Sequence, residues 1–153
     1  MVREKEDEMS VGKICTRTVA TASANESVLT AARRMAEYNV GTVVVVDEVS
    51  QPIGFVTDRD VVLRCVAPGL GAAETVVASI MSSDLRTVDE STPIEEALRT
   101  MAGAGKRRLV VTGSGGTLAG LVSLDDFLEL LAEEAASVGE LLRKEAPEMA
   151  ASG

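Results

Sequence analysis

The stretch GFVTDRD (54–60) returns as GLVSLDD (120–126), 66 residues further along the chain. Both copies read Gly, two apolar residues, Thr or Ser, two further residues, and Asp. A hydroxyl followed by an acid at this spacing is a capping box for a helix that begins there. A capping box does not explain the glycine, which inside a strand marks a close backbone approach. The repeated glycine therefore predicts that a ligand or a partner strand lies against each motif.

The offset of 66 extends well beyond the motif and indicates an internal repeat. Matched pairs include Val11 and Val77, Ile14 and Ile80, Thr21 and Thr87, Ala31 and Ala97, Arg33 and Arg99, Met35 and Met101, Val45 and Val111, and Gly54 and Gly120. This pattern predicts two copies of one unit, at 11–66 and 77–136, joined by a Gly-rich and Ala-rich linker at 67–76. We expect a flexible N-terminus at 1–10 and a terminal helix and tail at 137–153.

Each copy shows the same order of apolar patterns, which predicts β-α-β-β-α. The first helix of each copy follows a cap, Ser27 in copy one and Thr92 in copy two. A β-branched run then predicts a buried strand, at 41–47 and at 107–113. The strand that carries the motif and a second helix complete the unit. A single unit of this size is marginal alone, so we expect an α/β (α+β) fold of two pseudo-symmetric units packed through their sheets.

Composition excludes several classes of function. The net charge of −9 and the aromatic content of 2% argue against binding nucleic acid or an anionic membrane. The absence of His and of a CxxC pattern argues against a metal site and against His-based catalysis. No apolar run is long enough to cross a membrane, and the expected location is cytoplasmic. Cys15 and Cys65 are interpreted as reduced, inert thiols, although a redox disulfide between them stays open.

The repeated motif also carries groups that suit a nucleotide. A helix N-terminus offers unpaired N–H groups and partial positive charge to an anion. Thr57 and Ser123 each add a hydroxyl that can bond phosphate. Asp60 and Asp126 can accept hydrogen bonds from ribose hydroxyls, as an acid does in dinucleotide-binding folds.

The order of these features, occurring twice, resembles a tandem pair of cystathionine-β-synthase-type (CBS) domains, a Bateman module. The blocks ESVLTAARRMAEYNVGTVVVVD (26–47) and STPIEEALRTMAGAGKRRLVV (91–111) carry the resemblance together with the two motifs. The first unit is also similar to small stand-alone bacterial CBS pairs, including the hypoxic response type. The resemblance implies a regulatory adenosyl ligand, such as AMP, ADP, ATP or S-adenosylmethionine, in the clefts between the units, with no obligatory cofactor.

Family positions then imply site residues. Thr57 and Asp60 would contact phosphate or ribose in one cleft, and Ser123 and Asp126 in the other. The strand residues Val44 and Val110 would offer backbone groups to the base. Arg108 stands where the family often places a phosphate-contacting arginine, and Arg107 is a second candidate, although both could be ordinary solvated charges.

The two copies differ at these positions. Arg107 and Arg108 correspond to Gly41 and Thr42 in copy one. Leu124 and Asp125 replace Asp58 and Arg59, which places an extra carboxylate near one site. We therefore expect one good site and one that is weak or empty.

The favoured hypothesis is a non-catalytic sensor that binds an adenosyl ligand between its halves and acts through a homodimer or an effector protein. The alternative is a scaffold dimer whose clefts are vestigial. An enzyme is the weakest hypothesis, because no nucleophile–base pair and no metal set is present. The ligand, the occupied cleft and the dimer geometry are left open by the sequence.

Overall fold

We analysed a computed structural model of the chain that describes the backbone of residues 9–151 and the side chains of residues 9–145. The predicted flexible N-terminus therefore lies mostly outside the described residues. The chain divides into two compact units, one ending at Val122 and one beginning at Ser123. The unit that ends at Val122 contains two three-stranded sheets, and the other consists of one long helix.

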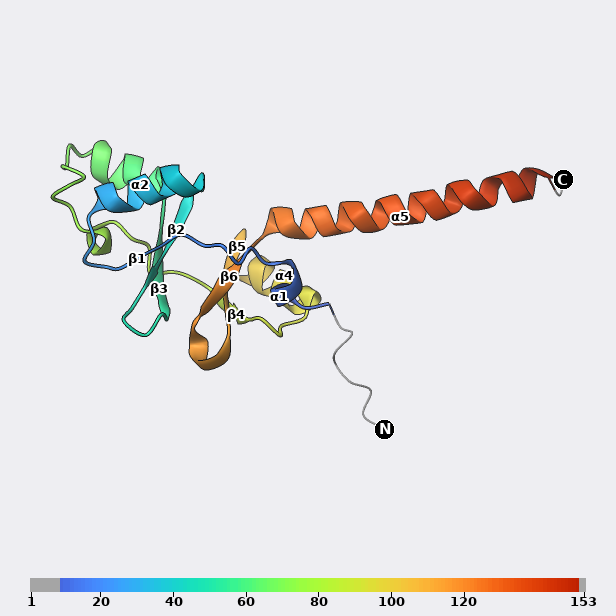
Figure 1. The fold of residues 1–153 in the computed structure, drawn as a ribbon, viewed down its shortest axis with the longest axis horizontal. Coiled ribbons are helices and arrows are strands. Elements are labelled where there is room, and N and C mark those ends of the chain that lie inside the picture. The colour runs from blue at the N-terminus through green and yellow to red at the C-terminus, as the bar shows by residue number, and fades with distance from the viewer. Residues whose placement is uncertain (1–8, 152–153) are drawn as a thin grey trace. The chain divides into compact units, whose positions relative to one another are not determined.

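The elements follow the predicted order twice (Figure 1). In copy one they are β1 (Thr21–Ala22), α2 (Val28–Tyr38), β2 (Thr42–Val46), β3 (Pro52–Thr57) and α3 (Asp58–Val61), which continues into a π-helical turn at Val62–Val66. In copy two they are β4 (Thr87–Asp89), α4 (Ile94–Ala104), β5 (Arg108–Thr112), β6 (Leu118–Ser123) and α5 (Leu124–Ala151). A short helix precedes each set, α1 (Val11–Ile14) and a 3-10 turn at Val77–Ser79. The predicted two-unit α+β fold is confirmed.

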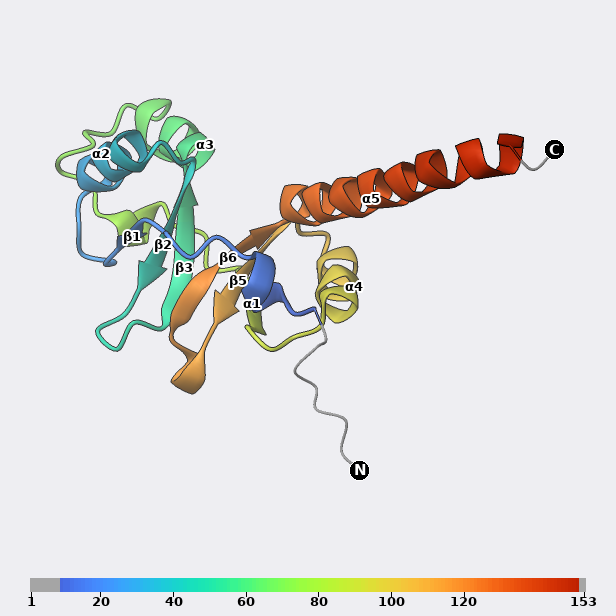
Figure 2. The same ribbon diagram turned by 45° about the vertical axis from the view of Figure 1, so that its right-hand side comes forward.

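The sheets have the orders β1-β2-β3 and β4-β5-β6. β1 runs parallel to β2, and β4 runs parallel to β5, as a helical crossover between neighbouring strands requires. The central strand of each sheet is the β-branched run that the sequence predicts as buried: Val43, Val44 and Val45 are each fully inaccessible to solvent. Figure 2 shows α2 and α3 side by side next to the first sheet.

One of the two predicted helix caps is confirmed, and the other is wrong. Ser27 caps α2 as expected, because its hydroxyl accepts a bond of 3.1 Å from the Thr30 N–H. The predicted Thr92 cap of α4 is wrong: the residue before the helix is Pro93, and no side chain caps it. The terminal helix expected within 137–153 is not separate, since α5 runs unbroken across residue 137.

The segment that leads into each copy is bound to the other copy. The N–H of Val77 donates to the Glu26 carbonyl at 2.8 Å, and the N–H of Val11 donates to the Thr92 carbonyl at 2.9 Å. Val77 also lies in the hydrophobic core of copy one with the β1, α2 and β2 side chains. These two exchanges are related by the repeat offset, so the copies are held together by a reciprocal swap of their leading segments.

Candidate functional site

The two motif glycines lie where the leading segments cross. A Cβ atom on Gly54 would stand 2.7 Å from the Ser82 carbonyl oxygen, and one on Gly120 would stand 2.7 Å from the Thr16 carbonyl oxygen. Paired backbone bonds of 2.9 Å join Phe55 to Ser82 in both directions. Of the two occupants that the sequence left open at these glycines, the partner strand is the one that the structure places there.

Both motifs form the capping box that their spacing predicts. The Thr57 hydroxyl accepts from the Asp60 N–H at 3.1 Å, and the Asp60 carboxylate accepts from the Thr57 N–H at 2.9 Å. Ser123 and Asp126 repeat this exchange at the start of α5, at 3.3 and 2.8 Å. The free oxygen of Asp60 lies 3.8 Å from Arg64, and the Asp60 side chain is only 15% exposed. Each acid is therefore engaged in its own helix start.

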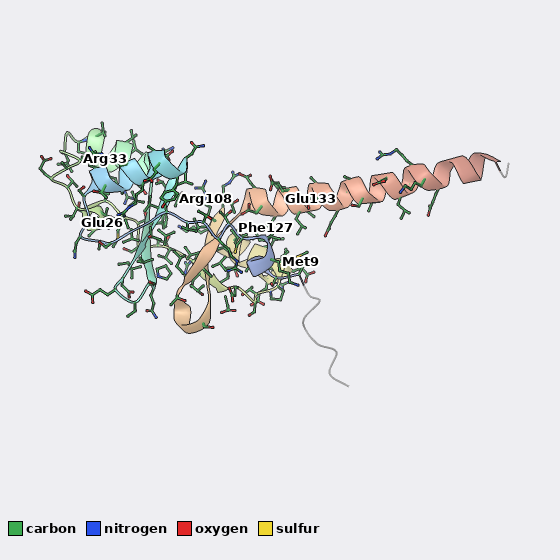
Figure 3. The ribbon with its side chains drawn as sticks, in the orientation of Figure 1. Met9, Glu26, Arg33, Arg108, Phe127 and Glu133 are labelled. Atoms are coloured by element: carbon green, nitrogen blue, oxygen red, sulfur yellow. The ribbon has the colours of Figure 1, made fainter. Side chains whose placement is uncertain are left out.

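A pocket of about 180 Å³ lies beside the first motif. Its wall combines Thr42, Phe55 and Thr57 of copy one with charged and apolar residues of copy two. The lining residues are Thr42, Phe55, Thr57, Asp84, Leu85, Arg86, Lys106, Arg107, Arg108, Leu109, Val110 and Leu121. Four predicted site residues, Thr57, Arg107, Arg108 and Val110, thus come together. Figure 3 marks Arg108 at the start of β5.

The remaining predicted residues stand elsewhere. Asp60 is not part of the pocket wall, and Val44 is fully buried in the first sheet, where its N–H donates to the Ala20 carbonyl at 2.9 Å. The N–H of Val110 is likewise used, because it donates to the Arg86 carbonyl at 2.9 Å. The backbone N–H groups of both strand residues are therefore taken up by the sheets.

The pocket is strongly basic for a chain of net charge −9. Four cations line it and one carboxylate, Asp84, opposes them. Asp84 bonds Lys106 at 2.7 Å and lies 4.0 Å from Arg86, and its hydrogen bond and attraction to Lys106 hold its pKa below the ordinary value. Within the described part of the chain, no carboxylate pairs with Arg107 or Arg108. These two guanidinium groups are available to an anion.

One polar atom in the pocket lacks a partner. The Thr42 hydroxyl oxygen is buried and has no hydrogen-bond partner among the described residues. Buried polar atoms in proteins are nearly always bonded, so an orphan of this kind calls for an explanation. Thr42 is also one of the residues that line the pocket.

Sequence reasoning missed several of these residues. Asp84 and Arg86 stand before a short strand and belong to no motif, and Thr42 was noticed only as the counterpart of Arg108. The first motif, through Thr57, and the KRR run (106–108) are the two signals that reached this pocket directly from sequence.

A larger groove of about 870 Å³ follows the outer edge of β1 and holds none of the predicted site residues. Arg34 is its only cation, and this guanidinium is bound to the Glu26 carboxylate and, at 2.7 Å, to the Thr21 carbonyl. The groove is therefore less suited to an anionic ligand than the smaller pocket.

Two further observations limit the chemistry of the described residues. They contain no group of three or more acidic or Cys side chains that could hold a metal ion. None of their helices is both long and apolar enough to cross a bilayer.

Two repeated α+β units, clasped reciprocally around a basic pocket, define a tandem-repeat module. A model of the CBS domain matches residues 11–66 and 77–133, and the chain therefore belongs to the CBS domain family and carries two such domains in tandem. CBS pairs are generally regulatory, non-catalytic modules.

Known relatives agree with this assignment. An uncharacterised protein of Methanopyrus kandleri is 35% identical over 136 residues, which cover 89% of this chain and 69% of the relative. Hypoxic Response Protein I, solved with two coordinated zinc ions, has the same fold with a TM-score of 0.69 at 24% identity, covering 79% of this chain and 98% of that one. The predicted similarity to hypoxic response proteins is confirmed at the level of the fold.

A third neighbour was solved with a nucleotide. The cytosolic domain of the Mg²⁺ channel MgtE, in complex with ATP, has a TM-score of 0.68 and 25% identity, covering 79% of this chain and 48% of that one.

Proposed function

We propose that this protein is a non-catalytic sensor that binds an adenine nucleotide in the pocket between its two CBS units, with the phosphate at Arg107 and Arg108. The observation that carries the proposal is the basic pocket: Arg107 and Arg108, both without a carboxylate partner among the described residues, line one space together with Thr42 in an acidic protein. The ATP complex of the similar MgtE domain supports the choice of ligand class.

The pocket wall carries two kinds of side chain that suit the two ends of a nucleotide. Phe55, Leu85 and Leu121 are apolar lining residues that suit a base. Arginine forks suit phosphate, because two parallel N–H donors match its oxygens and the bonds are charge-assisted. The volume of about 180 Å³ is below the roughly 300 Å³ of a typical small-molecule pocket. Part of the ligand therefore stays in contact with solvent.

The charge of the pocket separates the candidate ligands. AMP, ADP and ATP bring negative charge to the arginines. S-adenosylmethionine instead carries a positively charged sulfonium next to its adenosyl group. Like charges in a partly dehydrated site repel, so we expect the nucleotides to bind more tightly than S-adenosylmethionine. Ligand binding would act by changing the balance between conformations or assemblies of the module.

Isothermal titration calorimetry with AMP, ADP, ATP and S-adenosylmethionine tests the proposal. We expect one nucleotide to give a binding signal. Arg108→Ala should lower the affinity for that nucleotide about 10-fold or more, because a charged hydrogen bond is lost. Arg33→Ala is the matched control, because Arg33 is an exposed arginine of α2 that lies outside the pocket (Figure 3).

Thr42→Val gives an independent readout. It removes an unbonded buried hydroxyl, so the free protein should be equally stable or slightly more stable, while nucleotide affinity falls about 3- to 10-fold. Absence of heat with every ligand would contradict the sensor and would leave the scaffold dimer as the better account. Turnover of a nucleotide by the purified protein would contradict the non-catalytic part.

A further inference from the structure

The long helix of copy two, α5, is mostly exposed beyond its first turn. Its first turn is partly covered, and the Phe127 side chain is only 2% exposed. From Leu131 to Glu145 every residue is exposed except Gly139, which is half-buried. Among the described side chains of α5, up to Glu145, five large apolar ones are more than half exposed: Leu128, Leu131, Val138, Leu141 and Leu142.

Four of these five side chains lie on one stripe of the helix. Leu128, Leu131, Ala135, Val138 and Leu142 follow one another at spacings of 3, 4, 3 and 4 residues. This alternation keeps apolar side chains on the seam of a helix that packs along another helix. Ala135 stands at the middle of the stripe, and a small residue there permits close approach of the two backbones. The helical periodicity places charged residues on the opposite side, among them Glu133, which Figure 3 labels on α5.

The charges of α5 determine which partner direction is compatible. The half from 124 to 134 holds five acidic and no basic residues, and the half from 135 to 145 holds two of each. Two parallel copies would place the acidic halves side by side, which is repulsive. Two antiparallel copies place each acidic half beside the half that contains Arg143 and Lys144.

The geometry of the stripe gives the same orientation. With Ala135 of both copies opposite each other, Leu128 of one copy faces Leu142 of the other. On a helix of about 3.6 residues per turn, Arg143 and Asp125 flank the stripe on the same side. Antiparallel packing brings such same-side flanks together, and Arg143 of each copy then lies beside Asp125 of its partner.

We propose that α5 is a self-association surface and that its partner is α5 of a second copy of this chain, packed antiparallel along the stripe from Leu128 to Leu142. The pairing uses the helix beyond the first turn and is independent of the nucleotide pocket.

Sedimentation velocity of the full chain with Leu131→Glu/Leu142→Glu tests the surface. Both side chains are exposed, so the fold should survive, as circular dichroism would check. We expect the assembled mass to fall by half and the dissociation constant to rise at least 100-fold. Ser137→Glu, on the opposite side of α5, is the matched control and should leave the mass unchanged. A wild-type monomer, or an unchanged mass in the double variant, would overturn the proposal.

Cysteine cross-linking tests the orientation. Under mild oxidation, Leu128→Cys/Leu142→Cys should form covalent dimers, whereas Leu128→Cys alone should not. The chain without added cysteines, which retains Cys15 and Cys65, gives the background. Efficient cross-linking of the single variant would establish a parallel pair and overturn the antiparallel arrangement.

A charge swap, Arg143→Glu with Asp125→Arg, should restore association that Arg143→Glu alone weakens.

Discussion

The two CBS copies share one backbone plan but contribute different chemistry to the pocket. Copy one supplies hydroxyl groups, from Thr42 and Thr57, and copy two supplies the cations. The residues that stand 66 positions before Arg86, Lys106, Arg107 and Arg108 are Ala20, Val40, Gly41 and Thr42. None of these counterparts is basic. The two copies therefore share a backbone plan, and the divergence at the strand starts gives the pocket its positive charge.

The reciprocal swap of leading segments, called the clasp below, constrains the backbones of the two copies more than the side chains of the pocket wall. Each leading segment crosses to the other copy and lies against its motif glycine, at Gly54 and at Gly120. A change in the path of one copy would disturb the other, because each copy completes its partner's sheet contacts. Side chains at the pocket wall are not bound by this constraint.

The largest effect is expected from giving copy two the residues of copy one. Arg107→Gly/Arg108→Thr removes both unpaired guanidinium groups from the pocket. Each charged hydrogen bond contributes about 1.5–3 kcal/mol, so nucleotide affinity should fall about 100-fold or more. Calorimetry measures this, with the free energy of unfolding in urea as the control. Unchanged affinity would place the nucleotide elsewhere. It would also show that the difference between the two copies at Arg107 and Arg108 does not determine nucleotide binding.

The clasp predicts equal costs for the two motif glycines. In Gly54→Ala and in Gly120→Ala the new methyl meets a backbone carbonyl at 2.7 Å unless the backbone shifts. Overpacking of this kind costs about 1–3 kcal/mol, and the two values should agree because the contacts are equivalent.

Gly103→Ala is the control for these two variants. Gly103 lies within α4 in open space, and alanine should stabilise the helix by up to about 1 kcal/mol. Urea unfolding gives all three values. A large loss at one motif glycine alone would show that the copies are not clasped equivalently.

Sequence periodicity and repetition were enough to predict the fold. The run Val43–Val44–Val45 is a local pattern, and the offset between Gly54 and Gly120 is an internal repeat. A single sequence is enough to find both. The capping boxes were predictable for the same reason, since each involves residues three apart. The Thr92 cap failed because Pro93, with its fixed φ and extended ψ, stands between it and the helix.

The pocket was predictable only where a motif marked it. Thr57 and Arg108 were found through a motif and a basic run. The roles of Asp84 and Arg86 depend on which segments lie next to each other after the leading segments cross, and no local pattern encodes that crossing. The location of Asp60 outside the pocket wall has a local origin instead, because its carboxylate is turned toward the Thr57 N–H in the capping box.

The two capping boxes allow a sharper test of how far the copies are alike. Thr57→Ala and Ser123→Ala each remove the hydroxyl of a capping box and should each cost about 0.5–2 kcal/mol in urea unfolding. In calorimetry, Thr57→Ala should also weaken nucleotide binding, because Thr57 lines the basic pocket. If Ser123→Ala weakens binding equally, the second motif also serves a ligand, and the copies are functionally closer than their charges indicate.

The smallest effect concerns Asp84, the one acid of the pocket, whose counterpart in copy one is the uncharged Thr18. Lys106 holds the pKa of Asp84 below its ordinary value of 3.8. A lowered pKa means that the ionised carboxylate is favoured in the folded protein, so its contribution is present above pH 3.8 and is lost as the pH falls through the lowered pKa. The group is solvent-exposed, so the contribution is small. Asp84→Asn should therefore melt slightly below the wild type near neutral pH and converge with it in acid.

The same variant should bind nucleotide about twofold more tightly at neutral pH, because one repulsive charge has gone from the pocket. Weaker binding would show instead that Asp84 orients Lys106 for the ligand, and copy two would then need its acid as well as its cations.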